Sequence, residues 1–330
     1  MKKINLGIIG TGLAAEELHL PALLKLKNQI KIAKVCNHTE VKAKRFSMLA
    51  GNVPYTMDYK EILNDPKIEA VDILLPIDLN YKITKEALKA GKHVIVEKPI
   101  AANLTEAKKM LMLQKEFQKV MMVAENFRYR KNFTFAKKLI DKNTIGKVYS
   151  LKYDVFHNVH ENSKYAKTKW RKNHKYSGGF LTDGGVHYIA GIRHLIGEIK
   201  SGVAVTHSVN SKIGELDTLS LQFKTAKNIF GTFNMHYSAK GFWEDRVVVL
   251  GDAGAIEIDQ DKVIVRKEGK PPKEYDCSDD HGFYNELNNF YNAITKGEKI
   301  IGTFDEAYKD LNIVLSALKS AATGKKVYFR

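Results

Sequence analysis

Two ionisable residues in the segment Gly178–Gly191 are spaced for proton chemistry. Asp183 and His187 lie four residues apart, so their side chains would share one face of a helix. An imidazole titrates near neutral pH and can accept or donate a proton. Gly184 and Gly185 stand between them, and each costs a helix roughly 0.8–1 kcal/mol relative to Ala. Two interpretations stay open: the glycines let a ligand or a backbone come very close, or they belong to an ordinary glycine-rich helix start with Asp183 near the N-cap.

A second chemical pattern lies at the front of the chain, where the apolar run INLGIIG leads into a GxGxxA turn and then a helical segment. This context is typical of dinucleotide binding, because the glycines allow a tight turn and a close approach of pyrophosphate to the backbone. The helix start supplies N–H groups for the phosphates. The alternative is a turn with a purely structural role. The predicted cofactor-binding residues of this turn are Gly10, Thr11, Gly12, Leu13 and Ala14.

The end of the second predicted strand favours NADP over NAD. An Asp or Glu at this place would bind the adenosine ribose hydroxyls and repel a 2′-phosphate. This chain has the neutral Asn37, then His38, with basic residues following at 42, 44 and 45. The alternative is that these basic residues only form the solvated face of the next helix.

Lys98 is the third candidate for chemistry. It lies in the segment Glu97-Lys98-Pro99, which ends the apolar strand HVIVE. Doubly wound sheets bind ligands at the carboxyl ends of their strands, so we expect Glu97 and Lys98 beside the cofactor. Taken alone, Lys98 is equally compatible with a surface lysine, and His187 with a core histidine.

Two kinds of domain must position these residues. Over residues 1–124, apolar strands alternate with helical segments of the length that crossover helices need, which predicts a doubly wound parallel Rossmann sheet. Over residues 125–330, strands follow one another with short turns, as in VVVLGDAGAIEIDQDKVIVRKEG, before a helical tail. We therefore expect an α/β protein with an N-terminal dinucleotide-binding domain. Its C-terminal substrate and oligomerisation domain would be α+β, built on a large open, mainly antiparallel sheet.

The order of these motifs resembles the Gfo/Idh/MocA family of NAD(P)-dependent oxidoreductases. The resemblance rests on GIIGTGLAA, VEKPIA, AENFRY, KWRKN, GGFLTDGGVHYIAGIRHLIG and FYNELNNFYNAI. It implies that Lys98 is the catalytic lysine and that Asp183 and His187 complete the site. The family commonly has a His where this chain has Asn80. The other positions that the resemblance places near cofactor or substrate are Asn37, His38, Leu75, Pro76, Asn80, Asn126, Trp170 and Arg171.

The chemistry that this resemblance implies is hydride transfer between NADP, or NAD, and a sugar, polyol or related hydroxy or carbonyl compound. Such a transfer needs a base for the hydroxyl proton, for which we prefer His187. Lys98 would stabilise developing alkoxide charge, and Asp183 would position His187 or bind a neighbouring hydroxyl. Which of Lys98 and His187 moves the proton stays open. Tyr284 is a further predicted substrate contact. Two alternatives are a non-catalytic nucleotide-binding sensor and an NAD-dependent glycosidase.

Composition and charge limit the classes of binding partner that we expect. The net charge is +16, but only eight of the 53 basic residues are Arg and they form no block, so we expect no nucleic acid. No apolar run reaches the roughly 18 residues of a membrane span. The two cysteines lie far apart, which fits a reducing cytoplasm. We interpret His157, His160 and Glu161 as a substrate-side or solvated loop and expect no metal. The open sheet predicts a homodimer or homotetramer.

Overall fold

A computed structural model of the 330-residue chain describes residues 2–168, 171, 174 and 176–329. The chain forms two compact units. The first comprises Met1–Asn126 and Gly282–Tyr308, and the second comprises Phe127–His281 and Lys309–Arg330. The segment Gly282–Tyr308 belongs to the first unit, whereas the domain bounds predicted from the sequence, 1–124 and 125–330, place it in the second domain.

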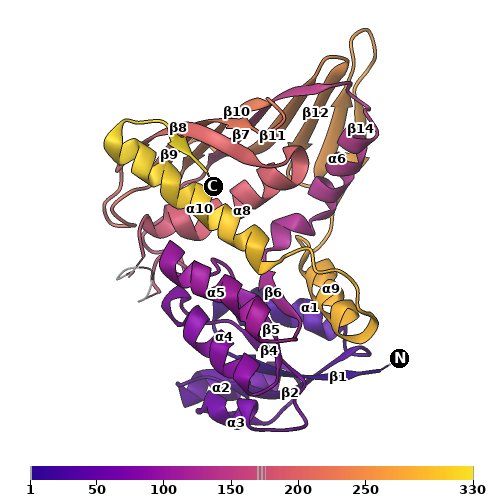
Figure 1. The fold of residues 1–330 in the computed structure, drawn as a ribbon, viewed down its shortest axis with the longest axis vertical. Coiled ribbons are helices and arrows are strands. Elements are labelled where there is room, and N and C mark those ends of the chain that lie inside the picture. Colours follow the sequence, from indigo (N-terminus) through magenta and orange to yellow (C-terminus); the bar gives the residue numbers. More distant parts are fainter. Residues whose placement is uncertain (1, 169–170, 172–173, 175, 330) are drawn as a thin grey trace. The chain divides into compact units, whose positions relative to one another are not determined.

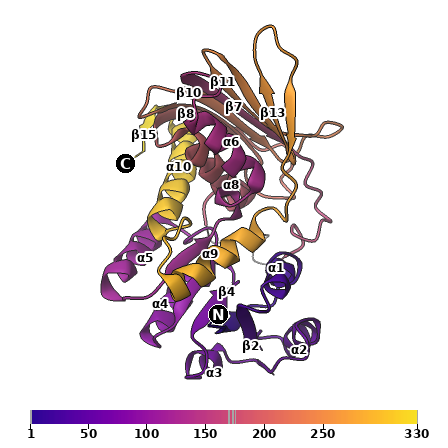
Figure 2. The ribbon, with the colours of Figure 1, turned by 90° about the vertical axis from the view of Figure 1, so that its right-hand side faces the viewer.

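The first unit is built on six parallel strands in the order β3-β2-β1-β4-β5-β6. Strands β1, β4 and β6 are almost entirely buried and, apart from the polar Asn5 and Asp72, mainly apolar, as a sheet covered on both faces requires. In Figure 2, α4 and α5 lie on one side of the strands and α1 on the other. The predicted doubly wound sheet is confirmed. Its elements are β1 (Ile4–Ile9), the π-helical turn η1 (Ala15–His19), α1 (Leu20–Lys25), β2 (Ile30–Cys36), α2 (Glu40–Leu49), β3 (Tyr55–Thr56), α3 (Tyr59–Leu63), β4 (Ala70–Ile73), η2 (Ile77–Leu79), α4 (Asn80–Lys89), β5 (His93–Glu97), α5 (Leu104–Glu116), β6 (Met121–Ala124) and α9 (Phe283–Lys296).

The second unit is built on a nine-stranded sheet in the order β14-β13-β12-β11-β7-β10-β9-β8-β15. β7 and β10 pair parallel, and the other strand pairs of this sheet are antiparallel. Figure 1 shows α6, α8 and α10 on one face of this sheet. The predicted open, mainly antiparallel sheet is confirmed. Its elements are η3 (Asn126–Arg128), α6 (Lys131–Asp141), β7 (Val148–Phe156), α8 (Gly179–Ile196), β8 (Ile199–His207), β9 (Thr218–Thr225), β10 (Phe230–His236), β11 (Glu244–Gly251), β12 (Gly254–Asp259), β13 (Lys262–Arg266), β14 (Lys273–Asp276), α10 (Phe304–Thr323) and β15 (Val327–Tyr328).

A buried ion network joins α8 to α10 in the second unit. The carboxylate of Asp310 accepts hydrogen bonds from Arg128 at 2.7 Å and from Arg193 at 2.5 Å. The side chains of Asp310, Arg128 and Arg193 are at most 5% exposed. Arg193 also pairs with the half-exposed Glu198 at 2.8 Å, so two guanidinium groups share the buried Asp310 carboxylate and one of them reaches a second carboxylate. Within the described ranges, no helix combines the length and the apolar character that a membrane crossing requires.

Candidate active site

The carboxyl edge of the six-stranded sheet collects most of the predicted cofactor residues. Parallel strands all end on one side of their sheet, so residues far apart in the sequence become neighbours there. The structure places these residues after five strands: positions 10–14 after β1, Asn37 and His38 after β2, Leu75 and Pro76 after β4, Glu97 and Lys98 at the end of β5, and Asn126 after β6.

The turn after β1 fits the phosphates of a dinucleotide. Gly10 has a φ of +101°, and a Cβ there would lie 2.2 Å from the carbonyl oxygen of Leu74, so only glycine fits. A Cβ built on Gly12 meets no atom within 4 Å, which leaves its backbone open to a ligand. The buried Thr11 hydroxyl has no hydrogen-bond partner among the described residues. An open backbone, an unused hydroxyl and the start of a helical turn are the groups that bind phosphate.

No Asp or Glu follows β2 at the position where a carboxylate would bind the adenosine ribose hydroxyls. The Asn37 side chain is buried and accepts a hydrogen bond from the Thr39 amide at 2.9 Å, which shapes the turn into α2. His38 is exposed. Arg45, on the outer face of α2, forms an ion pair with Glu16 of η1. A guanidinium group is thereby held next to the helical turn that follows the glycine pattern.

Asn80 differs from its predicted role in one respect. Its side chain is 0% exposed, and its amide nitrogen donates to the carbonyl oxygens of Glu97 and Pro99, each at 2.9 Å. The amide group is therefore engaged with the protein's own backbone on both sides of Lys98. Contact of Asn80 with a cofactor stays a prediction.

Asp183 and His187 lie on α8 of the second unit. The helix begins at Gly179, with Gly178 at a φ of +82° as its N-cap, so Asp183 stands in the second turn and not at the cap. Its carboxylate accepts a hydrogen bond from Arg171 Nε at 2.8 Å. The His187 ring stacks on Phe127 with a centroid separation of 5.0 Å. Arg171 thus lies against Asp183, and the roles of both residues in the site stay predictions.

The glycines of α8 lie close to side chains of the second unit. A Cβ on Gly184 would approach the Tyr237 hydroxyl to 1.9 Å. A Cβ on Gly191 would approach the Phe133 ring to 2.6 Å, and one on Gly185 would lie 3.3 Å from Val314. The glycines therefore let this helix pack closely against neighbouring elements of its own unit. That contact offsets their low helix propensity.

The remaining predicted positions are less informative. Trp170 lies outside the described residues. Tyr284 is the second residue of α9, in the first unit, and is half-buried. His157 stacks on Trp243 with a centroid separation of 5.7 Å, and Glu161 pairs with Lys212 at 3.0 Å. In the described part of the chain, no group of three or more His, Cys, Asp or Glu residues could hold a metal ion.

Comparison with known proteins identifies the family. Residues 4–125 match the model of the Gfo/Idh/MocA oxidoreductase family described as an NAD-binding Rossmann fold. Residues 137–329 match the C-terminal alpha/beta domain of the same family. The chain belongs to the Gfo/Idh/MocA oxidoreductase family. This protein is therefore an oxidoreductase whose Rossmann domain binds NAD or NADP.

Relatives of this oxidoreductase extend over the whole chain. The uncharacterized protein YMR315W of Saccharomyces cerevisiae is 35% identical over 98% of this chain and 97% of its own. A crystal structure of an oxidoreductase from Thermotoga maritima aligns with a TM-score of 0.93 and 35% identity over 99% of both chains. The scyllo-inositol 2-dehydrogenase (NADP(+)) IolW of Bacillus subtilis is 32% identical over 66% of this chain and 57% of its own.

Sequence reasoning missed a buried charge cluster in the first unit of this oxidoreductase. His19 Nδ1 lies 2.8 Å from Asp72 Oδ2, and His19 Nε2 lies 3.3 Å from Glu97 Oε1. Burial alone would lower the pKa of His19, but the charges and hydrogen bonds of Asp72 and Glu97 raise it well above its ordinary value. An acidic residue inside the fully buried strand AVDI was the signal for this cluster.

Glu286 of α9 completes the cluster. It is 0% exposed, and both carboxyl oxygens have no hydrogen-bond partner among the described residues. Burial raises the pKa of Glu286 well above its ordinary value; His19 opposes this effect, and the nearby carboxylates of Glu97, Glu125 and Asp72 add to it. Burial therefore favours the neutral, protonated form of Glu286 in the folded protein.

We predict that Glu286→Gln changes how stability depends on pH. The folded state holds the Glu286 proton more tightly than the unfolded state, so stability falls as pH rises above the pKa of an unfolded Glu. The decline is up to about 1.4 kcal/mol per pH unit until the folded pKa is reached. The variant lacks this decline. In urea titrations, its free energy of unfolding should therefore rise relative to that of wild type between pH 5 and pH 7. Glu116→Gln, at the exposed end of α5, is the control. Parallel curves for Glu286→Gln and wild type would contradict the assignment.

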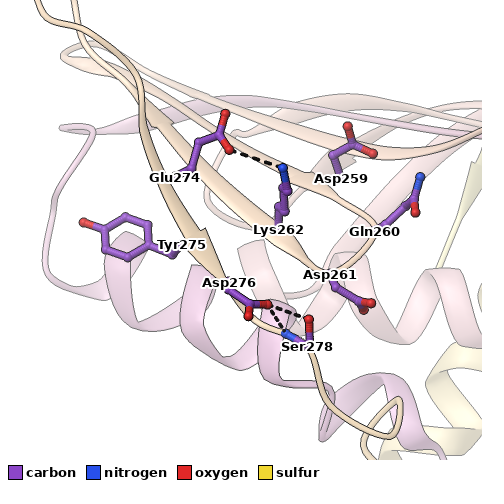
Figure 3. Close-up of a pocket in the computed structure, with 8 residues that line it drawn as sticks. All are labelled: Asp259, Gln260, Asp261, Lys262, Glu274, Tyr275, Asp276 and Ser278. Carbon is purple, nitrogen blue, oxygen red and sulfur yellow. Dashed lines mark hydrogen bonds and ion pairs between the residues drawn. The ribbon is translucent and has the colours of Figure 1, made fainter.

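A separate hollow lies in the second unit, near the turn between β12 and β13. It has a volume of about 500 Å³ and an acidic lining (Figure 3). Lys262 pairs with Glu274 across it at 3.4 Å, and Asp276 accepts hydrogen bonds from Ser278. The charges of the lining residues thus partly neutralise one another, and we assign this hollow no role in the oxidoreductase site.

Proposed function

We propose that this protein is an NADP-preferring dehydrogenase or reductase that acts on a hydroxyl group of a sugar, polyol or related compound. The observation that carries the proposal is the placement of Lys98 at the end of β5, on the same sheet edge as the glycine turn after β1. The name of the Bacillus subtilis relative, scyllo-inositol 2-dehydrogenase (NADP(+)), supports both the substrate class and the cofactor.

The proposed chemistry assigns a role to each polar side chain. The nicotinamide cofactor, when bound, accepts or supplies the hydride. Lys98 donates a hydrogen bond to the substrate oxygen and stabilises its developing negative charge. His187 takes or returns the hydroxyl proton, and Phe127 holds its ring by stacking. Asp183 fixes the guanidinium of Arg171, which then presents donors to further hydroxyl groups.

The preference for NADP rests on the end of β2. The neutral Asn37 offers no negative charge to repel a 2′-phosphate, and Arg45 supplies a guanidinium group on the following helix. Its ion pair with Glu16 is largely exposed on the Arg45 side, so exchange for a phosphate costs little.

A substrate panel with cofactor variants tests this function. We expect turnover of at least one inositol, sugar or polyol with NADP, measured by absorbance at the nicotinamide band. Asn37→Asp or Arg45→Ala should weaken NADPH binding about tenfold or more and leave NADH binding nearly unchanged. Lys31→Ala, an equal loss of charge near the amino end of β2, is the control. Tight cofactor binding without turnover on any compound would favour a sensor instead.

We also propose that the protein is a cytoplasmic homo-oligomer. Both cysteines are free and buried, which fits a reducing compartment. Phe230, Val203 and Val205 point away from the helices that cover the nine-stranded sheet and are 57%, 42% and 66% exposed. A second copy would cover this face. Sedimentation velocity should give a dimer or tetramer, and a monomer at micromolar concentration would contradict the proposal.

A further inference from the structure

The turn that carries Lys98 is bridged by one buried side chain. Asn80 is the first residue of α4, and its amide nitrogen donates to the carbonyl oxygens of Glu97 and Pro99, each at 2.9 Å. These carbonyls belong to the residues directly before and after Lys98. A single amide group therefore spans the lysine's backbone from the inside of the unit.

The side chain of Glu97 fixes the same turn through a second contact. Its carboxylate lies 3.3 Å from His19 Nε2, and the other nitrogen of that ring lies 2.8 Å from Asp72 of the neighbouring strand β4. His19 and Asp72 are both 0% exposed. Glu97 is thus anchored both through its side chain and through its carbonyl, directly before Lys98.

Lysine needs such support because its side chain is long and flexible. Its rotamer freedom is worth about 2 kcal/mol, so an amine on a loose backbone samples many positions. A misplacement of about 1 Å in a reacting group can cost roughly 10²-fold in rate. The backbone on both sides of Lys98 must therefore be fixed if the amine is to meet one substrate oxygen.

We propose that Asn80 is a positioning residue for Lys98, which it orients by holding the carbonyl groups on either side of it. The proposal rests on the proposed function in that it takes Lys98 as the acting amine. A histidine at this position could also donate a hydrogen bond from nitrogen to a backbone carbonyl.

The first test measures Lys98 directly and needs no substrate. Full-length protein is pulse-labelled with acetic anhydride, and modification of the Lys98 peptide is followed by mass spectrometry relative to Lys89, an exposed lysine at the end of α4. Asn80→Asp keeps the shape but loses both donated bonds. We expect its Lys98 labelling rate to change by at least about threefold, because the turn opens locally. Asn80→His retains one nitrogen donor, so its Lys98 labelling rate should stay closer to wild type than that of Asn80→Asp.

The second test separates positioning from binding. With a substrate found in the panel, Asn80→Asp should lower kcat about 10²-fold, whereas the NADPH dissociation constant, measured by nucleotide fluorescence, changes less than about threefold. Asn80→His should recover most of kcat. Thr84→Val is the matched control, since Thr84 lies one turn further along α4, is 0% exposed and has a hydroxyl without a partner among the described residues.

The outcomes are distinct. Unchanged Lys98 labelling in a folded Asn80→Asp variant overturns the proposal, and so does equal loss of kcat in Asn80→Asp and Asn80→His. If Asn80→Asp does not fold, Asn80→Ser replaces it, because serine is too short to bridge both carbonyls and must show the same altered labelling. Failure of the proposed function would instead appear as full turnover in a Lys98 variant, which leaves the labelling result valid.

Discussion

Lys98→Met should lose turnover by about 10³-fold or more with every substrate that wild-type protein accepts. Methionine keeps the length of the side chain and removes the ammonium group, so the backbone turn held by Asn80 and His19 stays in place. What is lost is the hydrogen bond and charge that stabilise the substrate oxygen as the hydride moves. The measurement is the steady-state rate together with the NADPH dissociation constant, which should change less than about threefold.

The control for this prediction is Lys89→Met, an exposed lysine at the end of α4, which should retain full activity.

The variant His187→Gln distinguishes the two candidate proton carriers, His187 and Lys98. If His187 moves the proton, this variant loses the limb of the pH–rate profile that the catalytic base produces. If Lys98 moves it, that limb persists in His187→Gln at a reduced rate. Turnover of Lys98→Met within about tenfold of wild type would refute the proposed mechanism.

Asp310→Ala should destabilise the second unit by about 3–5 kcal/mol. The substitution removes the carboxylate that both Arg128 and Arg193 contact, while both guanidinium groups stay in an environment that excludes water. The cost arises mostly from these buried charges, which lose the Asp310 carboxylate without regaining hydration, whereas Arg193 keeps its ion pair with Glu198. For a unit of this size the melting temperature should fall by about 6–20 °C, measured by differential scanning calorimetry.

Asp305→Ala tests whether the effect belongs to the buried network. Asp305 lies in the first turn of the same helix, α10, and is exposed, so its loss should cost about 1 kcal/mol or less. Equal shifts for the two variants would show that the Asp310 network contributes no more than a surface charge does.

Much of the candidate site could be predicted because it depends on local patterns. Alternation of apolar strands with helices predicts a parallel sheet, and the ends of such strands meet at one edge. Gly10, Asn37, Lys98 and Asn126 therefore could be placed on one edge without coordinates, and the structure places them there. The dinucleotide turn could be predicted from its glycines for the same reason, because the positive φ of Gly10 is a requirement of the local backbone.

The contacts that required the structure link residues distant in sequence. Asn80 was predicted as a cofactor contact, yet its amide bridges two carbonyls seventeen and nineteen residues later. The spacing of Asp183 and His187 correctly placed both on one helix, but the sequence left two interpretations of Gly184 and Gly185 open, because their neighbours Tyr237 and Val314 lie far along the chain. Glu286 looked like an ordinary polar residue of an amphipathic helix and is fully buried beside His19.

By itself the amino-acid sequence determined the two sheets, the dinucleotide turn and the residue types available for proton and hydride chemistry, because strand and helix periods and tight turns are local properties of the chain. Only the tertiary structure decided what holds those residues in place. Burial and hydrogen bonding join positions such as 19, 72, 97 and 286, whose proximity depends on how the whole unit packs.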